Sequence, residues 1–223
     1  PISDKVAPKL KDTAKILYIA YLGITVLQTA LLMLGGMDLF QALIHTFGTV
    51  GTGGFSTKNT SVGAFHSSYI TLVIGIFMML SGINFSLYYE LYKKRFRHIL
   101  QNIELRAYLS IILVSTILIA INIYSLYGSV FESFKHAFFQ VSSIITTTGY
   151  SSVNYDLWPS FSKAILFFLM FVVGSAGSTG GAIKVIRIVI LFMFVRREIK
   201  KLLHPRALIP IQLNQKMLSG DVV

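Results

Sequence analysis

Cysteine is absent from this 223-residue sequence, which excludes a disulfide framework and a thiolate-bound metal site. Charged residues are also scarce, at 13% of the chain against about a quarter in an ordinary soluble domain. Carboxylates are the rarest charged groups, with nine Asp and Glu against twenty Lys and Arg. Because the sequence has neither a close acidic pair nor an H-E-x-x-H motif, we expect a protein that is not an enzyme and carries no cofactor.

The composition that remains is apolar and basic. Hydrophobic residues make up 54% of the chain, and the mean hydropathy is +0.68. This composition favours lipid as the solvent rather than water. The formal charge of +11 is concentrated at the ends of apolar runs instead of along a polar face. That pattern is typical of membrane flanks and argues against a nucleic-acid partner.

Four apolar runs are long enough to cross a bilayer, for which a helix needs about 20 residues. They cover residues 16–34, 69–92, 107–127 and 161–195. Two weaker amphipathic stretches, 38–57 and 130–152, lie between the first and second runs and between the third and fourth. Neither stretch is long enough to span on its own.

Clusters of Lys and Arg precede the first run, separate the second from the third, and follow the fourth. Because cytoplasmic flanks collect basic residues, we place all three clusters in the cytoplasm. Each weak stretch then enters and leaves the membrane by the outer side. The sequence therefore predicts an all-α integral membrane fold with two helix, re-entrant loop, helix units. These are residues 1–100 with a loop at 48–57, and 101–200 with a loop at 143–152 and a broken helix at 161–195; residues 201–223 form a cytoplasmic linker.

An internal repeat agrees with this division. A shift of 95 residues places Gly54 on Gly149 and aligns several neighbours. The aligned pairs are Ala42 with Ala137, Thr52 with Thr147, Phe55 with Tyr150, and Asn59 with Asn154. Since these pairs gather at the loops, we interpret the chain as a duplication.

The two Gly/Thr/Ser segments inside the re-entrant stretches carry the candidate chemistry. Irregular backbone at membrane depth is tolerated only where it is buried in protein or lines water, so we expect both segments to face a pore. Extended backbone there can turn successive carbonyls toward a dehydrated cation, and the preceding stretches, 38–48 and 132–143, are predicted to be pore helices whose C-terminal dipoles favour that cation. The predicted ion ligands are Val50, Gly51, Thr52, Gly53 and Gly54 in the first segment and Ile145, Thr146, Thr147, Thr148 and Gly149 in the second.

An alternative interpretation makes each segment an ordinary turn on the outer surface. The protein would then be a non-conducting structural or partner-binding membrane subunit. Two segments in register, each preceded by an amphipathic stretch, favour the filter.

The fourth apolar run is interrupted at residues 174–181, where four of eight positions are glycine. Glycine with serine and threonine weakens a helix, so we expect a flexible coil below the filter. Lys184 and Arg187 follow directly; they either repel cations, hold the coil in place or extend to the cytoplasmic interface. In the second run, we expect Asn84 to lie within a helix and to pack against another helix near the pore.

Four motifs together resemble a known family. They are the loop at 51–57, Ser-Gly-Ile-Asn-Phe-Ser at 81–86, Gly-Ser-Thr-Gly-Gly-Ala-Ile-Lys-Val-Ile-Arg at 177–187, and His-Pro-Arg at 204–206. With them the chain resembles the TrkH/KtrB group of the Trk/Ktr/HKT cation transporters, which are bacterial potassium uptake channel subunits. The resemblance implies a voltage-gated-like channel fold with four repeats around one pathway, potassium as the transported ion, and one filter strand per repeat.

The same resemblance implies an intramembrane gating loop made of Gly174, Ser175, Gly177, Ser178, Thr179, Gly180 and Gly181, with Lys184 and Arg187 beside it. It also implies a homodimer in the bacterial inner membrane, in contact with lipid and regulated by a cytoplasmic nucleotide-binding subunit of the TrkA or KtrA type. Only the second and third repeats are expected here, as a piece of a longer protein, so these residues alone are not expected to conduct.

Overall fold

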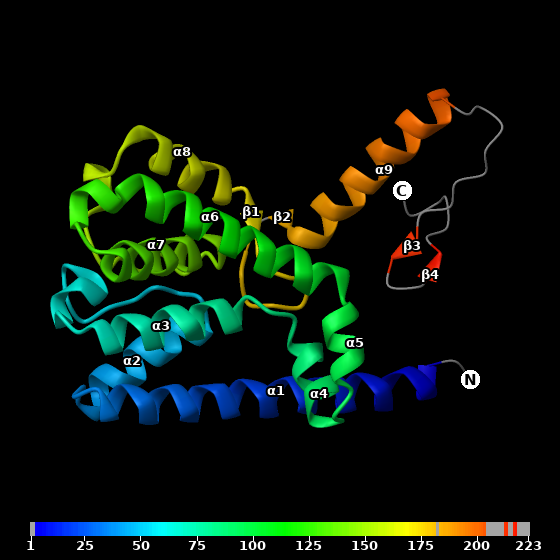
Figure 1. Ribbon diagram of the computed structural model, residues 1–223. Coiled ribbons are helices and arrows are strands. Elements are labelled where there is room, and N and C mark those ends of the chain that lie inside the picture. The colour runs from blue at the N-terminus through cyan, green and yellow to red at the C-terminus, as the bar shows by residue number, and fades with distance from the viewer. Residues whose placement is uncertain (1–2, 182, 204–211, 214–215, 218–223) are drawn as a thin grey trace.

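The computed structural model describes residues 3–181, 183–203, 212–213 and 216–217. This part of the chain is mainly helical (Figure 1). Helix α1 runs along one side, and helices α6, α7 and α8 form a layer on the other, with α2 and α3 between them. The predicted helical class is confirmed.

The first half of the chain contains α1 (Ser3–Leu34), α2 (Leu39–Val50), a short 3-10 turn η1 (Ser61–Phe65), α3 (Ser68–Ser81), α4 (Phe85–Tyr92) and α5 (Phe96–Gln101). Helix α2 begins where Asp38 accepts a hydrogen bond from the Gln41 N–H at 2.7 Å. Helix α3 begins in the same way at Ser67, which accepts from the Ile70 N–H. Such side-chain caps satisfy backbone donors that a helix start leaves unpaired.

The second half contains α6 (Ile103–Tyr127), α7 (Val130–Ile145), η2 (Tyr155–Leu157), α8 (Ser160–Leu169) and α9 (Val185–Leu203). Helix α6 ends at Tyr127 and is capped by Gly128, whose φ of +64° is the left-handed conformation that favours glycine. Between α8 and α9, the two-residue strands β1 (Val172–Val173) and β2 (Ile183–Lys184) pair in parallel, with Val172 opposite Ile183. A second pair, β3 (Gln212–Leu213) and β4 (Lys216–Met217), is antiparallel.

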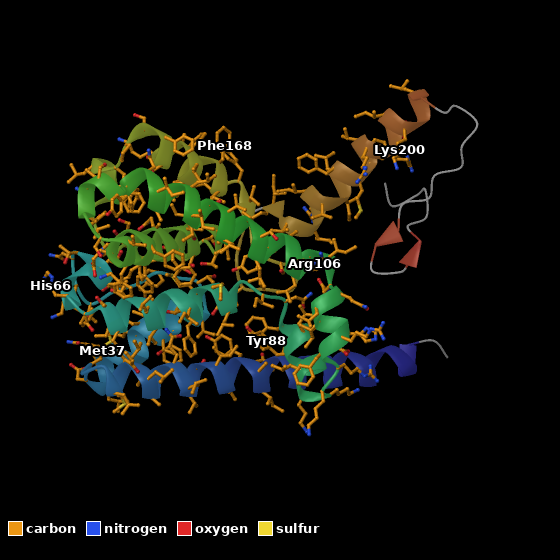
Figure 2. The ribbon with its side chains drawn as sticks, in the orientation of Figure 1. Met37, His66, Tyr88, Arg106, Phe168 and Lys200 are labelled. Carbon is orange, nitrogen blue, oxygen red and sulfur yellow. The ribbon has the colours of Figure 1, made fainter. Side chains whose placement is uncertain are left out.

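Two helices in the described chain are long and apolar enough to cross a membrane, namely α6 and the Leu17–Leu34 part of α1. Many of their large apolar side chains are exposed, as expected for contact with lipid. Figure 2 places Met37 and His66 toward one end of the molecule and Arg106 and Lys200 toward the other. The end with Arg106 and Lys200 is the one that the basic clusters assign to the cytoplasm.

One predicted helix is corrected by the structure. Residues 69–92 do not form a continuous span, because α3 ends at Ser81 and α4 starts at Phe85. The Asn84 side chain accepts from the Ser86 N–H at 2.9 Å, so it starts a new helix instead of packing within one. The hydropathy of the run is high on both sides of this break, which is why composition alone did not reveal it.

The buried core has two clusters. One lies among α6, α7 and α8 around Tyr108 and Ile145, and the other among α1, α2 and α3 around Leu32 and Ile74. Tyr150, which follows α7, belongs to the second cluster. A side chain from the second half therefore completes the core of the first half and holds the two loops together.

Candidate ion filter and gating loop

The two re-entrant loops have the same backbone course. Thr52 and Thr147 follow the ends of α2 and α7 with φ of +51° and +58°, and Gly54 and Gly149 also have positive φ, at +66° and +86°. A β-branched residue rarely adopts a left-handed conformation. Its occurrence at the same position of both loops indicates that the surrounding structure imposes it.

Matching hydrogen bonds close both loops. The Gly53 and Gly54 N–H groups donate to the Gly48 carbonyl at 2.8 and 3.1 Å. In the second loop, the Thr148 and Gly149 N–H groups donate to the Ser143 carbonyl at 3.0 and 3.3 Å. In each loop, two backbone N–H groups thus point back to a carbonyl near the end of the preceding helix. The carbonyls of the loop residues do not take part in these bonds.

Those carbonyls are unpaired. Within the described part of the chain, no hydrogen bond is accepted by the backbone carbonyls of residues 51–54 or 146–149. Residues 51, 53, 147 and 149 are exposed in this structure, and lipid cannot supply a hydrogen bond to an unpaired carbonyl. Two runs of four successive carbonyls are therefore available to a cation or to water.

Two of the predicted ion ligands lie at the ends of the helices. Val50 and Ile145 are the last residues of α2 and α7 and are fully buried, so they precede the non-helical segments. The Ile145 carbonyl also accepts from the Gly174 N–H at 3.0 Å. The non-helical segments begin at Gly51 and Thr146, where the helical turn ends.

The loops contact each other through Tyr150. Its hydroxyl donates to the Phe55 carbonyl at 2.7 Å and lies so close to Gly48 that a Cβ there would be 2.1 Å away. A Cβ on Gly54 would be 1.9 Å from the Thr148 carbonyl oxygen. Glycine at positions 48 and 54 is thus what allows the two loops to approach.

The segment between β1 and β2 lies against the break between α3 and α4. The Ser175 N–H donates to the Gly82 carbonyl at 2.8 Å, and the Phe85 N–H donates to the Gly177 carbonyl at 3.3 Å. The backbone groups freed by the break are therefore satisfied by this segment. Glycine at 174 permits the contact, because a Cβ there would be 2.7 Å from the Gly82 carbonyl oxygen.

The same segment also contacts both re-entrant loops at equivalent residues. The Thr52 hydroxyl donates to the Thr179 carbonyl at 3.2 Å. The Thr147 hydroxyl accepts from the Gly181 N–H at 3.1 Å. The sequence placed this coil below the filter, and the structure brings it to the first non-helical turn of each loop.

The two basic residues predicted beside the gating loop, Lys184 and Arg187, differ in position. Lys184 folds back over the segment, where its ammonium donates to the Gly180 carbonyl and to the Ser178 hydroxyl. Arg187 is exposed on the first turn of α9. The His-Pro-Arg motif at 204–206, residue 182 of the Gly-rich motif, and most of the predicted linker lie outside the described residues.

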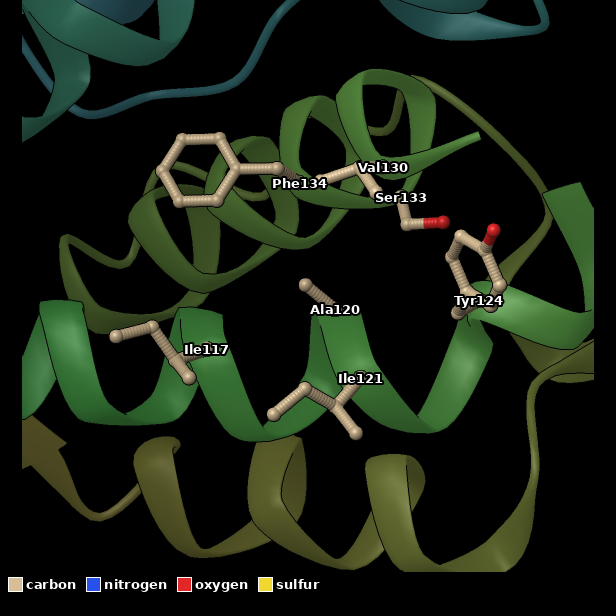
Figure 3. Close-up of a pocket in the computed structure, with 7 residues that line it drawn as sticks. All are labelled: Ile117, Ala120, Ile121, Tyr124, Val130, Ser133 and Phe134. Carbon is tan, nitrogen blue, oxygen red and sulfur yellow. The ribbon is translucent and has the colours of Figure 1, made fainter. Parts of the chain in front are cut away.

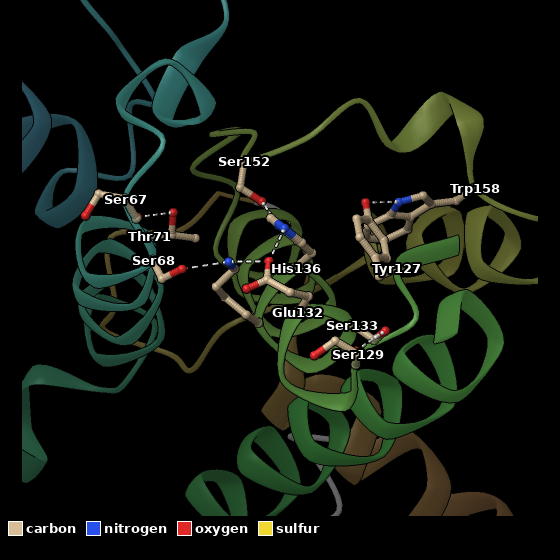
Figure 4. A network of polar contacts seen from close by, with 11 residues as sticks. Ser67, Ser68, Thr71, Tyr127, Ser129, Glu132, Ser133, His136, Ser152 and Trp158 are labelled. Carbon is tan, nitrogen blue, oxygen red and sulfur yellow. Dashed lines mark hydrogen bonds and ion pairs between the residues drawn. The ribbon is translucent and has the colours of Figure 1, made fainter. Parts of the chain in front are cut away.

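A polar network at the N-terminal end of α7 was not anticipated (Figure 4). Lys135 donates to Glu132 at 2.5 Å and to the Ser68 hydroxyl of α3 at 2.8 Å, while His136 contacts both Glu132 and the Ser152 hydroxyl. The hydrogen bond from Lys135 holds the pKa of Glu132 below its ordinary value, and burial lowers the pKa of His136. The sequence signal that could have revealed this network is the i, i+3, i+4 spacing of Glu132, Lys135 and His136 on one helix.

An apolar groove of about 320 Å³ lies between α6 and α7 (Figure 3). Its lining is mostly apolar, with Tyr124 and Ser133 as the polar residues. Its lining residues are Ile117, Ala120, Ile121, Tyr124, Val130, Ser133 and Phe134.

Comparison with known proteins agrees with this architecture. A family model described as TrkH, cation transport protein, matches residues 2–223. The Trk system potassium uptake proteins TrkH and TrkG of Escherichia coli are each 37% identical to this chain, over 100% and 99% of it. The crystal structure of the potassium transporter TrkH from Vibrio parahaemolyticus superposes with a TM-score of 0.86 at 36% identity, covering 92% of this chain and 45% of that one.

The class that the fold defines is a helical membrane protein. Within that class, the chain belongs to the TrkH family of cation transport proteins. It spans about half the length of the curated relatives that it matches, 47% of the Escherichia coli TrkH.

Proposed function

We propose that this chain supplies two adjacent strands of a four-strand potassium filter. The observation that carries the proposal is the pair of four-carbonyl runs at 51–54 and 146–149, which accept no hydrogen bond within the described chain. Carbonyl oxygens in this arrangement replace the hydration shell of an alkali cation. The ends of α2 and α7 precede both runs, so their helix dipoles add negative potential.

The segment at 174–181, with Lys184, is proposed as the gate beneath the filter. Its contacts with Thr52 and Thr147 support this role, because they place it against equivalent residues of both strands. A segment held there by hydrogen bonds obstructs the pathway until those bonds break. Arg187 is assigned to the same gate, on the helix that follows.

In the full protein, these units are proposed to be the second and third of four repeats. Potassium is proposed as the transported ion because the relatives are potassium uptake proteins. The remaining proposals are a homodimer in the bacterial inner membrane and a cytoplasmic nucleotide-binding subunit of the TrkA or KtrA type. The names of the relatives also place them in a Trk system.

Rubidium and potassium flux through the full-length parent tests the filter, with Gly54→Ser and Gly149→Ser introduced in turn. Both changes place a side chain at positive φ within the carbonyl runs, so we expect lower flux and weaker discrimination against sodium. Gly128→Ser is the matched control, since Gly128 also has positive φ but caps α6 away from the loops. Wild-type flux and selectivity in both loop variants would contradict the filter proposal.

Deleting residues 177–180 from the full-length parent tests the gate. The deletion removes the carbonyl of Thr179, to which Thr52 donates, together with the Gly180 carbonyl that holds Lys184. We expect basal flux to rise while ion selectivity is retained. An unchanged basal flux would count against a gating role.

A further inference from the structure

Glu104 is a buried carboxylate in the first turn of α6, with only 6% of its surface exposed. One of its oxygens accepts a hydrogen bond from the Ala176 N–H at 2.6 Å. Ala176 lies inside the proposed gate, 72 positions further along the chain. The carboxylate is therefore an anchor that comes from a helix outside the segment it holds.

Capping of its own helix does not explain this acidic residue. The start of α6 is already capped by Asn102, whose side chain accepts from the Leu105 N–H at 2.9 Å. Burying a carboxylate is costly unless it is paired. The position of Glu104 near the N-terminus of α6 offsets part of that cost, and the bond to the gate backbone is its specific partner.

Lys184 holds the same segment from its other end. Its ammonium donates to the Gly180 carbonyl and to the Ser178 hydroxyl, which in turn donates to the Ser175 carbonyl at 2.6 Å. The two charged groups thus fix the segment between them, one through Ala176 and the other through Gly180.

We infer that Glu104 is a positioning residue that latches the gate in its obstructing position under the filter. The inference rests on the proposed gating role of residues 174–181. Hydrogen bonds to a charged acceptor are stronger than neutral ones, so loss of this one bond favours release of the segment. Glu104 belongs to α6, so the latch connects the gate to the first helix of the second unit in this chain.

The test uses the full-length parent in proteoliposomes, with rubidium flux as the readout. Glu104→Ala removes the acceptor, and we expect basal flux to rise about tenfold, as a bond of about 1.5 kcal/mol or more predicts. Glu104→Gln keeps an acceptor oxygen, and flux should stay closer to wild type. Glu90→Ala is the matched control, because Glu90 pairs with Arg95 at 3.7 Å and lies on α4 rather than at the gate.

Epistasis distinguishes the latch from the gate itself. In a background that lacks residues 177–180, Glu104→Ala should add nothing to the flux. Raised flux in the deletion with unchanged flux in Glu104→Ala would overturn the latch and leave the gate standing. Unchanged flux in the deletion would overturn the gate instead.

A second variant keeps the latch testable if Glu104→Ala does not reach the membrane. Ala176→Pro removes the N–H donor and leaves the carboxylate in place. We expect raised basal flux with intact ion selectivity. Wild-type or lower flux in this variant, with normal amounts of protein in the membrane, would contradict the latch.

Discussion

Tyr150 donates a hydrogen bond from its hydroxyl to the backbone carbonyl of Phe55 at 2.7 Å, although the two residues occupy the same position in the two loops. The repeat is therefore not symmetric at this point. The ring of Tyr150 is fully buried between the loops, whereas Phe55 is 76% exposed. The hydroxyl of Tyr150 is the polar group that joins the loops at their ends.

Tyr150→Phe should destabilise the protein by about 1–2 kcal/mol, because it leaves a partly buried carbonyl without its donor. Thermal unfolding of the detergent-solubilised full-length parent measures the change. Tyr69→Phe is the matched control: its hydroxyl donates to the Leu31 carbonyl at 3.2 Å from an exposed position, where water can replace it. Equal shifts for the two variants would argue against a special role for Tyr150.

Gly48→Ala should be strongly destabilising on its own and partly rescued by Tyr150→Phe. The added Cβ would lie 2.1 Å from the Tyr150 hydroxyl oxygen but 3.1 Å from the ring carbon that bears it. Removing the hydroxyl therefore removes the severe clash. We expect a coupling free energy of at least about 1 kcal/mol in a double-mutant cycle, and simple additivity would refute the contact.

Gly54→Ala and Gly149→Ala should differ, although both glycines have positive φ. Each change introduces backbone strain of about 1–2 kcal/mol. At Gly54 the new Cβ would also meet the Thr148 carbonyl oxygen at 1.9 Å, whereas at Gly149 nothing lies within 4 Å. We expect a clearly larger drop in unfolding temperature for Gly54→Ala, and the reverse order would contradict the described approach of the loops.

Acid should weaken the polar network at the start of α7. Because burial lowers the pKa of His136, the folded protein favours the neutral ring; its contribution to stability is complete above about pH 6.5 and declines as pH falls toward the folded pKa. Because the pKa of Glu132 is also lowered, the contribution of this carboxylate to stability is lost only below about pH 4.5. Unfolding temperature should thus fall between pH 7.5 and 5.5.

His136→Gln should flatten that pH dependence, with His66→Gln, an exposed histidine of the same region, as the matched control. The measurement is thermal unfolding of the full-length parent across the pH range. A slope that survives His136→Gln would locate the pH dependence elsewhere.

Local patterns predicted the helices that precede the loops, because capping residues and amphipathic spacing act over a few residues. The predicted start at 38 agrees with the Asp38 cap of α2, and the positive φ of Gly54 and Gly149 agrees with their residue type. All three residues express a preference of the residue type itself.

Features that depend on tertiary contact were out of reach. The break at residues 82–84 is stabilised by Ser175 and Gly177, which are distant in sequence. The left-handed conformations of Thr52 and Thr147 oppose the preference of a β-branched residue. The role of Glu104 depends on Ala176, and no spacing along the chain connects those two residues.

The pairing of β1 with β2 has a consequence for the energetics of the proposed gate. By placing Val172 opposite Ile183, it holds the two ends of the glycine-rich segment together. Release then frees the torsions of a short closed loop, and the entropy gained depends only weakly on loop length. The free-energy difference between the bound and released segment then depends on a few hydrogen bonds. Because α9 continues directly from β2, a small displacement of that helix also moves the end of the segment.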